Sequence, residues 1–408
     1  MDGYTLRTAT ADDWAETDQI LQDVFNETWE NDAMEPERLV FEPDRTTYAV
    51  AADGEIAGQV GAYTRDMTVP GGTLPCGHVT MVGVRATHRR RGLLRWMITE
   101  QLADIRGRGE PIAALWASEG RIYQRFGYGL AAWRLALEID HEVALNTPVP
   151  AEAGRLRSAK FDDTAADLLT KTYERVRLAR PGFSNRSEAW WRKVLSDPPS
   201  AREGATPMRL TVHEGTDGID GYAIWRVKTD WDHSPKGQVQ VRELITADPV
   251  AYRALVGLLL SVDLTRTVTW GRAAVDEPVL QMVNEPRRLG AAQRDALWVR
   301  VTDLPAALAG RRYATPVDVV LGVTDALLPE NAGTWRLTGD TGSATCARTG
   351  ADPDLSLDVQ ALGAAYLGGP TLAQLAAAGR VVEHTPGALA RASAAFGWLR
   401  QPAATEGF

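Results

Sequence analysis

The sequence predicts an α/β (α+β) protein built from three consecutive units. Short apolar runs bounded by turn residues alternate with segments whose apolar residues recur every three or four positions. A length of 408 residues allows about two to four domains at roughly 100–200 residues each. With 44% apolar and 24% charged residues, the composition is globular and excludes collagen-like and wholly disordered chains. We expect the units to span 1–148, 149–298 and 299–408.

The first unit starts with an antiparallel meander. Strands are predicted over 47–51, 55–69 and 74–84, because turn signals (Asp53-Gly54, then Pro70-Gly71-Gly72) separate these runs. The elements predicted after them are a helix with apolar residues from Leu94 to Ile105, a buried strand over 112–117, and a short helix over 118–126 with Ser118 as N-cap and Gly127 as its end.

A loose segment, 146–150, is predicted to link the first unit to the second. The second unit repeats the element order of the first. Its predicted elements are a helix over 164–178, strands over 208–213, 221–228 and 238–246, and a helix over 250–264. The third unit is predicted to be a small α+β domain, with strands over 334–338 and 355–359 and Ala-rich helices over 362–367, 371–378 and 387–396.

The charge and the cysteines narrow the possible functions. A net charge of −9 gives the whole chain no general attraction for nucleic acid or an anionic membrane. Cys76 and Cys346 are too few for a disulfide framework and too far apart for a zinc motif. The longest aliphatic stretch is far below the ~20 residues needed to cross a bilayer, and no apolar signal segment follows Met1. We therefore expect a cytoplasmic protein with no metal.

The most informative stretch joins the strand ending at Val84 to the following helix. It holds four arginines, three of them consecutive at 89–91, followed by Gly92. A helix N-terminus has unpaired N–H groups and partial positive charge, and Gly92 lets a ligand approach the backbone closely. The alternative is that these arginines form a solvated basic loop. The position of the stretch between a strand and a helix favours an anion site.

Here the sequence resembles the Gcn5-related N-acetyltransferase (GNAT) superfamily, whose loop reads Arg/Gln-x-x-Gly-x-Gly/Ala. Residues 89–94 match this pattern except at Leu94, which replaces the small residue. Residues 123–128 (Tyr-Gln-Arg-Phe-Gly-Tyr) resemble the superfamily's Tyr-x-x-x-Gly-aromatic segment. Together, about 30 residues apart and in the right order, the two motifs are fairly specific.

A closer resemblance covers nearly the whole chain. Residues 89–95, residues 117–129 and the terminal Phe408 are similar to the actinobacterial enhanced-intracellular-survival (Eis) acetyltransferases. The resemblance implies two tandem GNAT-like domains with mixed central sheets and a C-terminal sterol-carrier-protein-like domain that ends in an active-site carboxylate. It also implies a hexamer, acetyl-CoA as co-substrate, and amine acceptors on aminoglycosides, often at several positions, or on protein lysines.

The resemblance assigns two chemical roles, one to Tyr123 in the first unit and one to the terminal Phe408. Tyr123 would be the general acid, because a phenol with a pKa near 10 stays protonated at neutral pH. The Phe408 carboxylate would be the general base. His78 and Tyr128 are interpreted as structural, and His88 as a surface residue. The residues expected to bind the cofactor are Val82, Gly83, Val84, Arg90, Arg91, Gly92, Leu93, Leu94, Arg95, Ser118 and Glu119.

A polyamine acceptor requires an acidic, aromatic pocket. Acidic residues and Trp29 on the first long helix and its exit supply that chemistry, although a solvated helix face is the alternative. Asp23 is the substrate residue proposed from these, and the resemblance adds Glu406, because the family has an acidic residue directly before the terminal Phe, whereas here Gly407 intervenes. The second unit has no glycine or basic cluster at its equivalent helix start, and Asp248 there would repel a pyrophosphate, so a scaffold without cofactor is expected.

Two other functions remain open. The chain could be a non-catalytic module that senses CoA and binds a lipid or protein through its third unit, or it could be a protein lysine acetyltransferase. Tyr123 and a terminal Phe408 favour an enzyme over the non-catalytic module.

Overall fold

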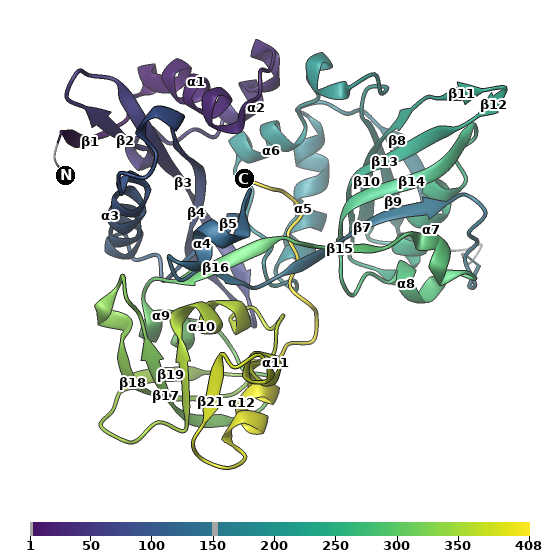
Figure 1. The fold of residues 1–408 in the computed structure, drawn as a ribbon. Helices are drawn as coiled ribbons and strands as arrows, with labels where there is room; N and C mark the ends of the chain where they lie inside the picture. Colours follow the sequence, from purple (N-terminus) through teal and green to yellow (C-terminus); the bar gives the residue numbers. More distant parts are fainter. Residues whose placement is uncertain (1–2, 149–153) are drawn as a thin grey trace.

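The computed structural model describes residues 3–148 and 154–408 (Figure 1). The first sheet has the strand order β1-β2-β3-β4-β5-β16-β6. Its strands are β1 (Tyr4–Thr8), β2 (Thr47–Ala51), β3 (Ile56–Val69), β4 (Gly72–Val84), β5 (Ile112–Trp116), β6 (Gly129–Leu130) and β16 (Leu297–Val301). The predicted meander over β2 to β4 is confirmed.

Helices cover both faces of this sheet. Neighbouring residues of a strand point to opposite faces. On β2, Ala49 packs in one cluster with Met97 of α3 (Leu93–Gly107), whereas Tyr48 packs in another with Ile20 of α1 (Trp14–Phe25). The short helices of this part are α2 (Glu35–Arg38) and α4 (Gly120–Gln124). The α/β class predicted for this part is therefore confirmed.

The second sheet has the order β15-β7-β14-β13-β10-β9-β8. Its strands are β7 (Trp133–Asp140), β8 (Arg155–Ala159), β9 (Arg209–Gly215), β10 (Gly218–Lys228), β13 (Gly237–Thr246), β14 (Thr265–Ala274) and β15 (Ala292–Asp295). The helices beside it are α5 (Ala165–Arg177), α6 (Glu188–Val194), α7 (Pro249–Leu260) and α8 (Val279–Met282), and β11 (Trp231–Asp232) with β12 (Ser234–Pro235) forms a separate hairpin.

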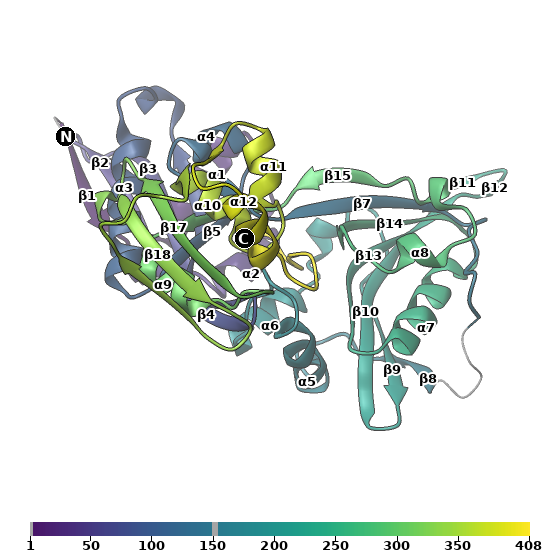
Figure 2. The ribbon, with the colours of Figure 1, turned by 90° about the horizontal axis from the view of Figure 1, so that it is seen from below.

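The first two units exchange strands. β7 lies in the second sheet, beside β14 and β15 (Figure 2), although the sequence placed it in the first unit. Conversely, β16 lies between β5 and β6 in the first sheet, and the expected boundary at 298–299 falls inside it. Pairing between strands more than 120 residues apart leaves no local pattern in the sequence, which explains the difference.

The third unit is a small α+β domain, as predicted. Its sheet has the order β19-β18-β17-β20-β21. Its elements are α9 (Leu304–Gly310), β17 (Val317–Thr324), β18 (Gly333–Gly339), β19 (Ala344–Arg348), β20 (Leu355–Asp358), α10 (Val359–Ala365), α11 (Leu372–Ala377), β21 (Val381–Glu383) and α12 (Ala388–Phe396). Its core is continuous with that of the first sheet, and a Cβ at Gly363 of α10 would collide with the carbonyl oxygen of Val299 in β16.

Several local predictions differ from the structure. The N-cap of α4 is Glu119 and not Ser118, because the helix begins two residues later than expected. α7 ends at Leu260 rather than at residue 264. The sequence patterns did not predict the strands β1, β6, β7, β8, β11, β12, β14, β15, β16, β17, β19 and β21. Part of the predicted linker over 146–150 lies outside the described residues.

Two searches of the described residues were negative. None of their helices is long and apolar enough to cross a membrane. They also contain no group of three or more His, Cys, Asp or Glu side chains placed to hold a metal ion.

Candidate active site

The candidate site begins where two parallel strands of the first sheet separate. β4 and β5 pair only from Cys76 with Ile112 to His78 with Ala114. Beyond that point, within the described chain, the edge of β4 that faces β5 has no strand partner as far as Val84. Its backbone N–H and C=O groups are therefore available to a ligand.

A β-bulge turns this edge further. Gln59 pairs with Gly83 and Gly61 with Thr80, so two residues of β4 stand opposite one residue of β3. Met81, within the bulge, has φ 53, a left-handed conformation that few non-glycine residues adopt. Bulges bend a strand and often redirect groups beside active sites. Here the bulge includes Val82, the first residue expected to bind the cofactor.

A groove of about 930 Å³ runs along this edge. Ten of the eleven expected cofactor residues line it: Val82, Gly83, Val84, Arg90, Gly92, Leu93, Leu94, Arg95, Ser118 and Glu119. The catalytic candidate Tyr123 also lines it, together with Val24 and Phe25 from α1. The structure thus brings the two sequence motifs together on one groove.

The basic loop presents an uncapped helix N-terminus to the groove. Gly92 is the N-cap of α3 with φ 85, and no side chain of the described residues caps the first turn. Arg90 also has a positive φ, 64, which costs a non-glycine residue about 1–3 kcal/mol. This geometry leaves the first N–H groups of α3 to an anion, with Arg90 and Arg95 beside them.

Arg91 is the expected cofactor residue that does not line the groove. Its guanidinium donates to the Tyr4 hydroxyl at 2.8 Å and to the Thr87 carbonyl oxygen at 3.2 Å. His88 is buried and not a surface residue, since its ring hydrogen-bonds with the Tyr4 hydroxyl at 2.8 Å and with Glu55 at 3.2 Å. Arg91 therefore ties the loop to β1.

Tyr123 lies at the junction of two cavities. It lines the groove and also a second cavity of about 380 Å³, and Val82 and Ser118 line both. Burial raises the pKa of Tyr123 to about 12, so its phenol stays protonated at neutral pH. Tyr128 packs edge-on against it, with ring centroids 6.0 Å apart, and is wholly buried.

The second cavity is acidic and aromatic. Glu27 and Glu37 line it, and Trp29 and Trp116 contribute aromatic walls. Lys193 forms an ion pair with Glu37 at 2.7 Å. Phe408 and Gly407 complete the lining, so the end of the chain enters this cavity.

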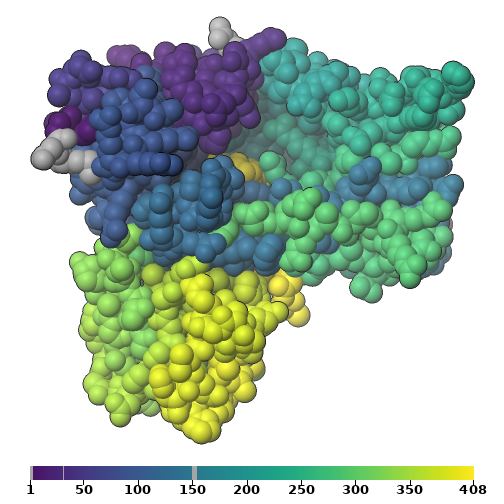
Figure 3. Space-filling model, viewed as in Figure 1, coloured from purple at the N-terminus to yellow at the C-terminus, as the bar shows by residue number. Residues whose placement is uncertain are grey.

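The C-terminal segment reaches this cavity by passing between the first two units (Figures 1 and 3). The Ala403 N–H donates to the Pro181 carbonyl oxygen at 3.0 Å, and Arg180 donates to that of Gln401 at 2.9 Å. The Phe408 ring lies against His78, with centroids 4.5 Å apart. The end of the chain is thus held by both units.

Glu406 is an anchor of this segment rather than part of the cavity wall. Its carboxylate forms ion pairs with Arg65 at 2.7 Å and Arg186 at 3.2 Å. Burial would raise the pKa of Glu406, but Arg186 and Arg65 outweigh it and lower the pKa to about 2. Arg186 in turn pairs with the buried Glu243 of β13.

Asp23 lies apart from the acceptor side. Its carboxylate pairs with Arg85 at 3.3 Å and accepts from Gln19 at 3.0 Å, and it lines neither cavity. It points instead into a surface cluster of charges around Arg85.

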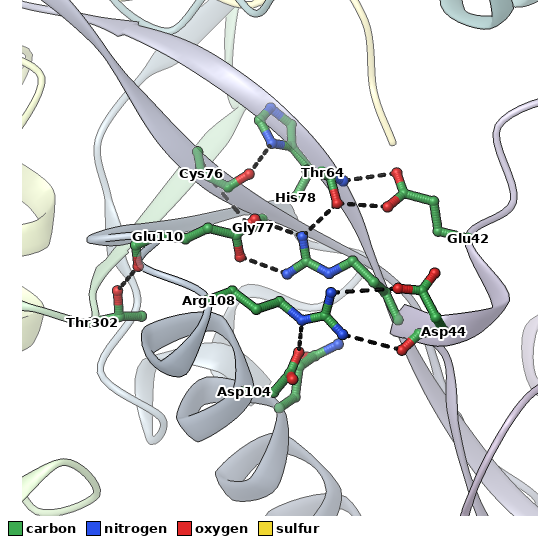
Figure 4. Close-up of polar contacts among 12 residues, drawn as sticks. Glu42, Asp44, Thr64, Cys76, Gly77, His78, Asp104, Arg108, Glu110 and Thr302 are labelled. Carbon is green, nitrogen blue, oxygen red and sulfur yellow. Dashed lines mark hydrogen bonds and ion pairs between the residues drawn. The ribbon is translucent and has the colours of Figure 1, made fainter.

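His78 is buried, and both nitrogens of its ring form hydrogen bonds. Its ring bonds with the Cys76 carbonyl oxygen at 3.1 Å (Figure 4) and with the Ser184 hydroxyl at 2.7 Å. Burial, with help from Arg65, lowers the pKa of His78 to about 3, so the ring is neutral at pH 7. The structural interpretation of His78 agrees with this geometry.

A buried ion pair supports β4 below the point of separation. Arg45 and Glu110 form a two-pronged pair with both contacts at 2.6 Å, and Arg45 also donates to Thr64 at 2.9 Å. Glu110 accepts from Thr302 through its backbone carbonyl at 2.6 Å (Figure 4). This network holds the fixed end of the two diverging strands.

Sequence reasoning missed several residues of the site. Met81, Glu37 and Trp116 are the clearest, because a bulge, a short helix and a strand end position them. Trp116 had one available signal, since it is the last residue of a strand that runs into the motif segment.

Comparisons with known proteins match this architecture. Two family models described as acetyltransferase (GNAT) domains match residues 5–131 and 182–301, and a sterol carrier protein domain matches 304–405. An uncharacterised N-acetyltransferase of Streptomyces avermitilis is 45% identical over 87% of this chain and 88% of its own. The N-acetyltransferase Eis of Mycobacterium tuberculosis is 34% identical over 84% and 83%. The crystal structure of Eis1 from Mycobacterium abscessus has a TM-score of 0.84 at 33% identity, covering 99% of this chain and all of that one.

Proposed function

Because this chain belongs to the Eis family of GNAT N-acetyltransferases, we propose that it transfers the acetyl group of acetyl-CoA to amines of small polycationic molecules of the aminoglycoside type. The observation that carries the proposal is the meeting of two cavities at Tyr123. One has an uncapped helix N-terminus with arginines, and the other has carboxylates and aromatic rings.

The groove fits acetyl-CoA by the chemistry of its lining. The N–H groups at the start of α3, with Arg90 and Arg95, would hold the pyrophosphate. The bulged edge of β4 at residues 82–84 would pair with the pantetheine arm and polarise the thioester carbonyl. When bound, acetyl-CoA supplies an activated acetyl group and a thiolate leaving group.

Tyr123 would complete the departure of that leaving group. As the acceptor nitrogen bonds to the acetyl carbon, the carbon–sulfur bond breaks and the sulfur takes the phenolic proton. A pKa raised to about 12 keeps that proton in place until a thiolate forms nearby. Its place between the two cavities supports this role.

The acceptor side would bind and deprotonate the amine. Ammonium groups that leave water require charge pairing or a π-face, and Glu27, Glu37 and Trp29 provide both. The Phe408 carboxylate would accept the proton that the acceptor nitrogen loses, directly or through water. A carboxyl group with an unperturbed pKa near 3.5 is a weak base, so its role depends on its place inside the cavity.

Release of thiol from acetyl-CoA tests the proposal. We expect release on addition of an aminoglycoside and none with an uncharged sugar of similar size. A lysine-containing peptide in the same assay separates a protein lysine acetyltransferase from an enzyme for small molecules. Binding of CoA with no transfer to either acceptor would favour the non-catalytic alternative.

We also propose that the chain assembles as a hexamer, on its resemblance to the Eis family. Mass photometry at micromolar concentration checks this directly, and a monomer or dimer there would contradict it.

A further inference from the structure

A third cavity lies where two parallel strands of the second sheet separate. β13 and β14 pair from Gly237 with Thr265 to Val241 with Trp270 and then diverge, as β4 and β5 do in the first sheet. The cavity between them has a volume of about 300 Å³. None of its lining residues lines the groove or the acceptor cavity.

The helix N-terminus beside this cavity is occupied by the protein itself. The carboxylate of Asp248, the N-cap of α7, accepts from the Val250 N–H at 2.6 Å and from that of Ala251 at 3.4 Å. In the first unit Gly92 leaves the same groups open. This third cavity therefore does not repeat the pyrophosphate site. Any anion in it must be held by side chains.

Arginines supply that charge. Arg242, Arg253 and Arg272 line the cavity, and within residues 3–148 and 154–408 none of them has a carboxylate within 4 Å. Arg242 donates one hydrogen bond to the Ser196 carbonyl oxygen at 2.7 Å. The buried Nε of Arg253 has no hydrogen-bond partner in the same part of the chain. Burial lowers the pKa of Arg242, Glu243 opposes this shift, and the nearby charge of Arg272 adds to it.

The acids of the cavity do not neutralise these arginines. Asp276 pairs with Arg180 at 2.6 Å, Glu243 pairs with Arg186, and Asp248 caps the N-terminus of α7. Burial raises the pKa of Glu277 to about 7, so this group carries only part of a charge at neutral pH. The cavity therefore keeps an excess of positive charge in a chain whose net charge is −9.

Three aromatic residues belong to the remaining wall. Phe183, Tyr252 and Trp270 line the cavity and are buried. Arg272 is exposed, so a ligand can enter from solvent on its side. This combination suits a molecule with an apolar body and a charged head.

The cavity also contacts the C-terminal segment. Ala403, Ala404 and Thr405 line it, three to five residues before Phe408. Arg272 lies against the Trp116 ring, 5.8 Å from its centroid, and Trp116 lines the acceptor cavity. Arg272 therefore connects this cavity with a wall of the acceptor cavity.

We propose that this cavity binds a small organic anion, with an apolar body and a carboxylate or phosphate head, and that its occupancy changes the binding of the acceptor through residues 403–408. The second half of this inference rests on the proposed function of Phe408, and the first half does not.

Calorimetry with benzoate and phenyl phosphate tests the binding half. Saturating CoA is present throughout, so that the groove of the first unit is filled. We expect one probe per chain to bind, and Arg242→Gln to weaken that binding at least tenfold. Arg287→Gln, which removes an exposed arginine outside the cavity, is the matched control and should bind as the wild type does. Binding of CoA to each variant shows that it is folded, and Arg253→Gln replaces Arg242→Gln if that variant fails this check.

The outcomes are distinct. Binding of neither probe, or equal binding to wild type and the Arg242→Gln variant, overturns the proposal. Preference for one probe identifies the head group. In the acetyl-transfer assay, the bound probe should change the KM for the acceptor in the wild type and not in the Arg242→Gln variant. An unchanged KM with intact binding rejects the coupling alone, and an absence of acetyl transfer bears only on the proposed function.

Discussion

Removing the charge of Glu406 tests how the C-terminal segment is held. Glu406→Gln keeps the size of the side chain but deletes the negative charge that faces Arg65 and Arg186, at 2.7 and 3.2 Å. Both arginines are fully buried side chains, so the substitution leaves two guanidiniums without this partner. We expect a less stable protein whose C-terminal end no longer stays in the acceptor cavity.

The pKa of Glu406 sets the size of the effect. It falls from 4.5 to about 2 on folding. At about 1.4 kcal/mol per pKa unit, this shift corresponds to roughly 3 kcal/mol of stability. A lowered pKa means that the contribution is complete above pH 4.5 and is lost as the pH falls toward 2. The wild type should therefore lose stability over this range, and the Glu406→Gln variant should lose less.

Urea unfolding at several pH values, with steady-state kinetics at pH 7, measures both effects. Glu35→Gln is the matched control, because Glu35 forms an exposed pair with Arg38 at 3.5 Å, and such pairs contribute about 0–1 kcal/mol. We expect Glu406→Gln to raise the acceptor KM while binding of acetyl-CoA stays unchanged. If it proves as mild as Glu35→Gln in stability and in KM, the anchoring role is refuted.

Three further predictions concern the site itself. Tyr123→Phe should lower kcat about 10²–10⁴-fold with acetyl-CoA binding intact, and a larger loss in Tyr128→Phe would reverse the assignment. Arg90→Ala should weaken acetyl-CoA binding by about 1–3 kcal/mol in calorimetry, and Arg91→Ala should weaken it less, because its guanidinium points to β1; the opposite order would disprove this placement. A semisynthetic amide of Phe408 should abolish turnover but retain cofactor binding, and full activity would exclude the terminal carboxylate as base.

Local patterns in the sequence predicted the parts of the site that lie close together in the chain. The arginine loop and the start of α3 were recognisable, because a helix N-terminus needs only a strand, a glycine and apolar periodicity to be identified. Tyr123 followed from a short motif. Arg91 was misplaced, since consecutive residues of a loop point in different directions and composition does not show which one faces the ligand.

Patterns in the sequence did not predict the contacts between residues far apart in the chain. The exchange of β7 and β16 depends on strand pairing, which apolar alternation does not specify. Asp23 was proposed as a substrate residue on its charge and Glu406 on the resemblance, and the structure pairs each with arginines brought from elsewhere in the chain. Their charge could be read from the sequence, but their partners could not.

The position of β16 has a consequence for how the protein is made. The first sheet lacks its strand between β5 and β6 until residues 297–301 have left the ribosome, although most of its other strands lie within the first 130 residues. Domains usually fold in the order of synthesis. The first sheet can be completed only after the second unit has been synthesised. Until then the edge of β5 that pairs with β16 stays uncovered. Fragments that end before β16 should therefore aggregate, and the two units should be inherited and engineered only as a pair.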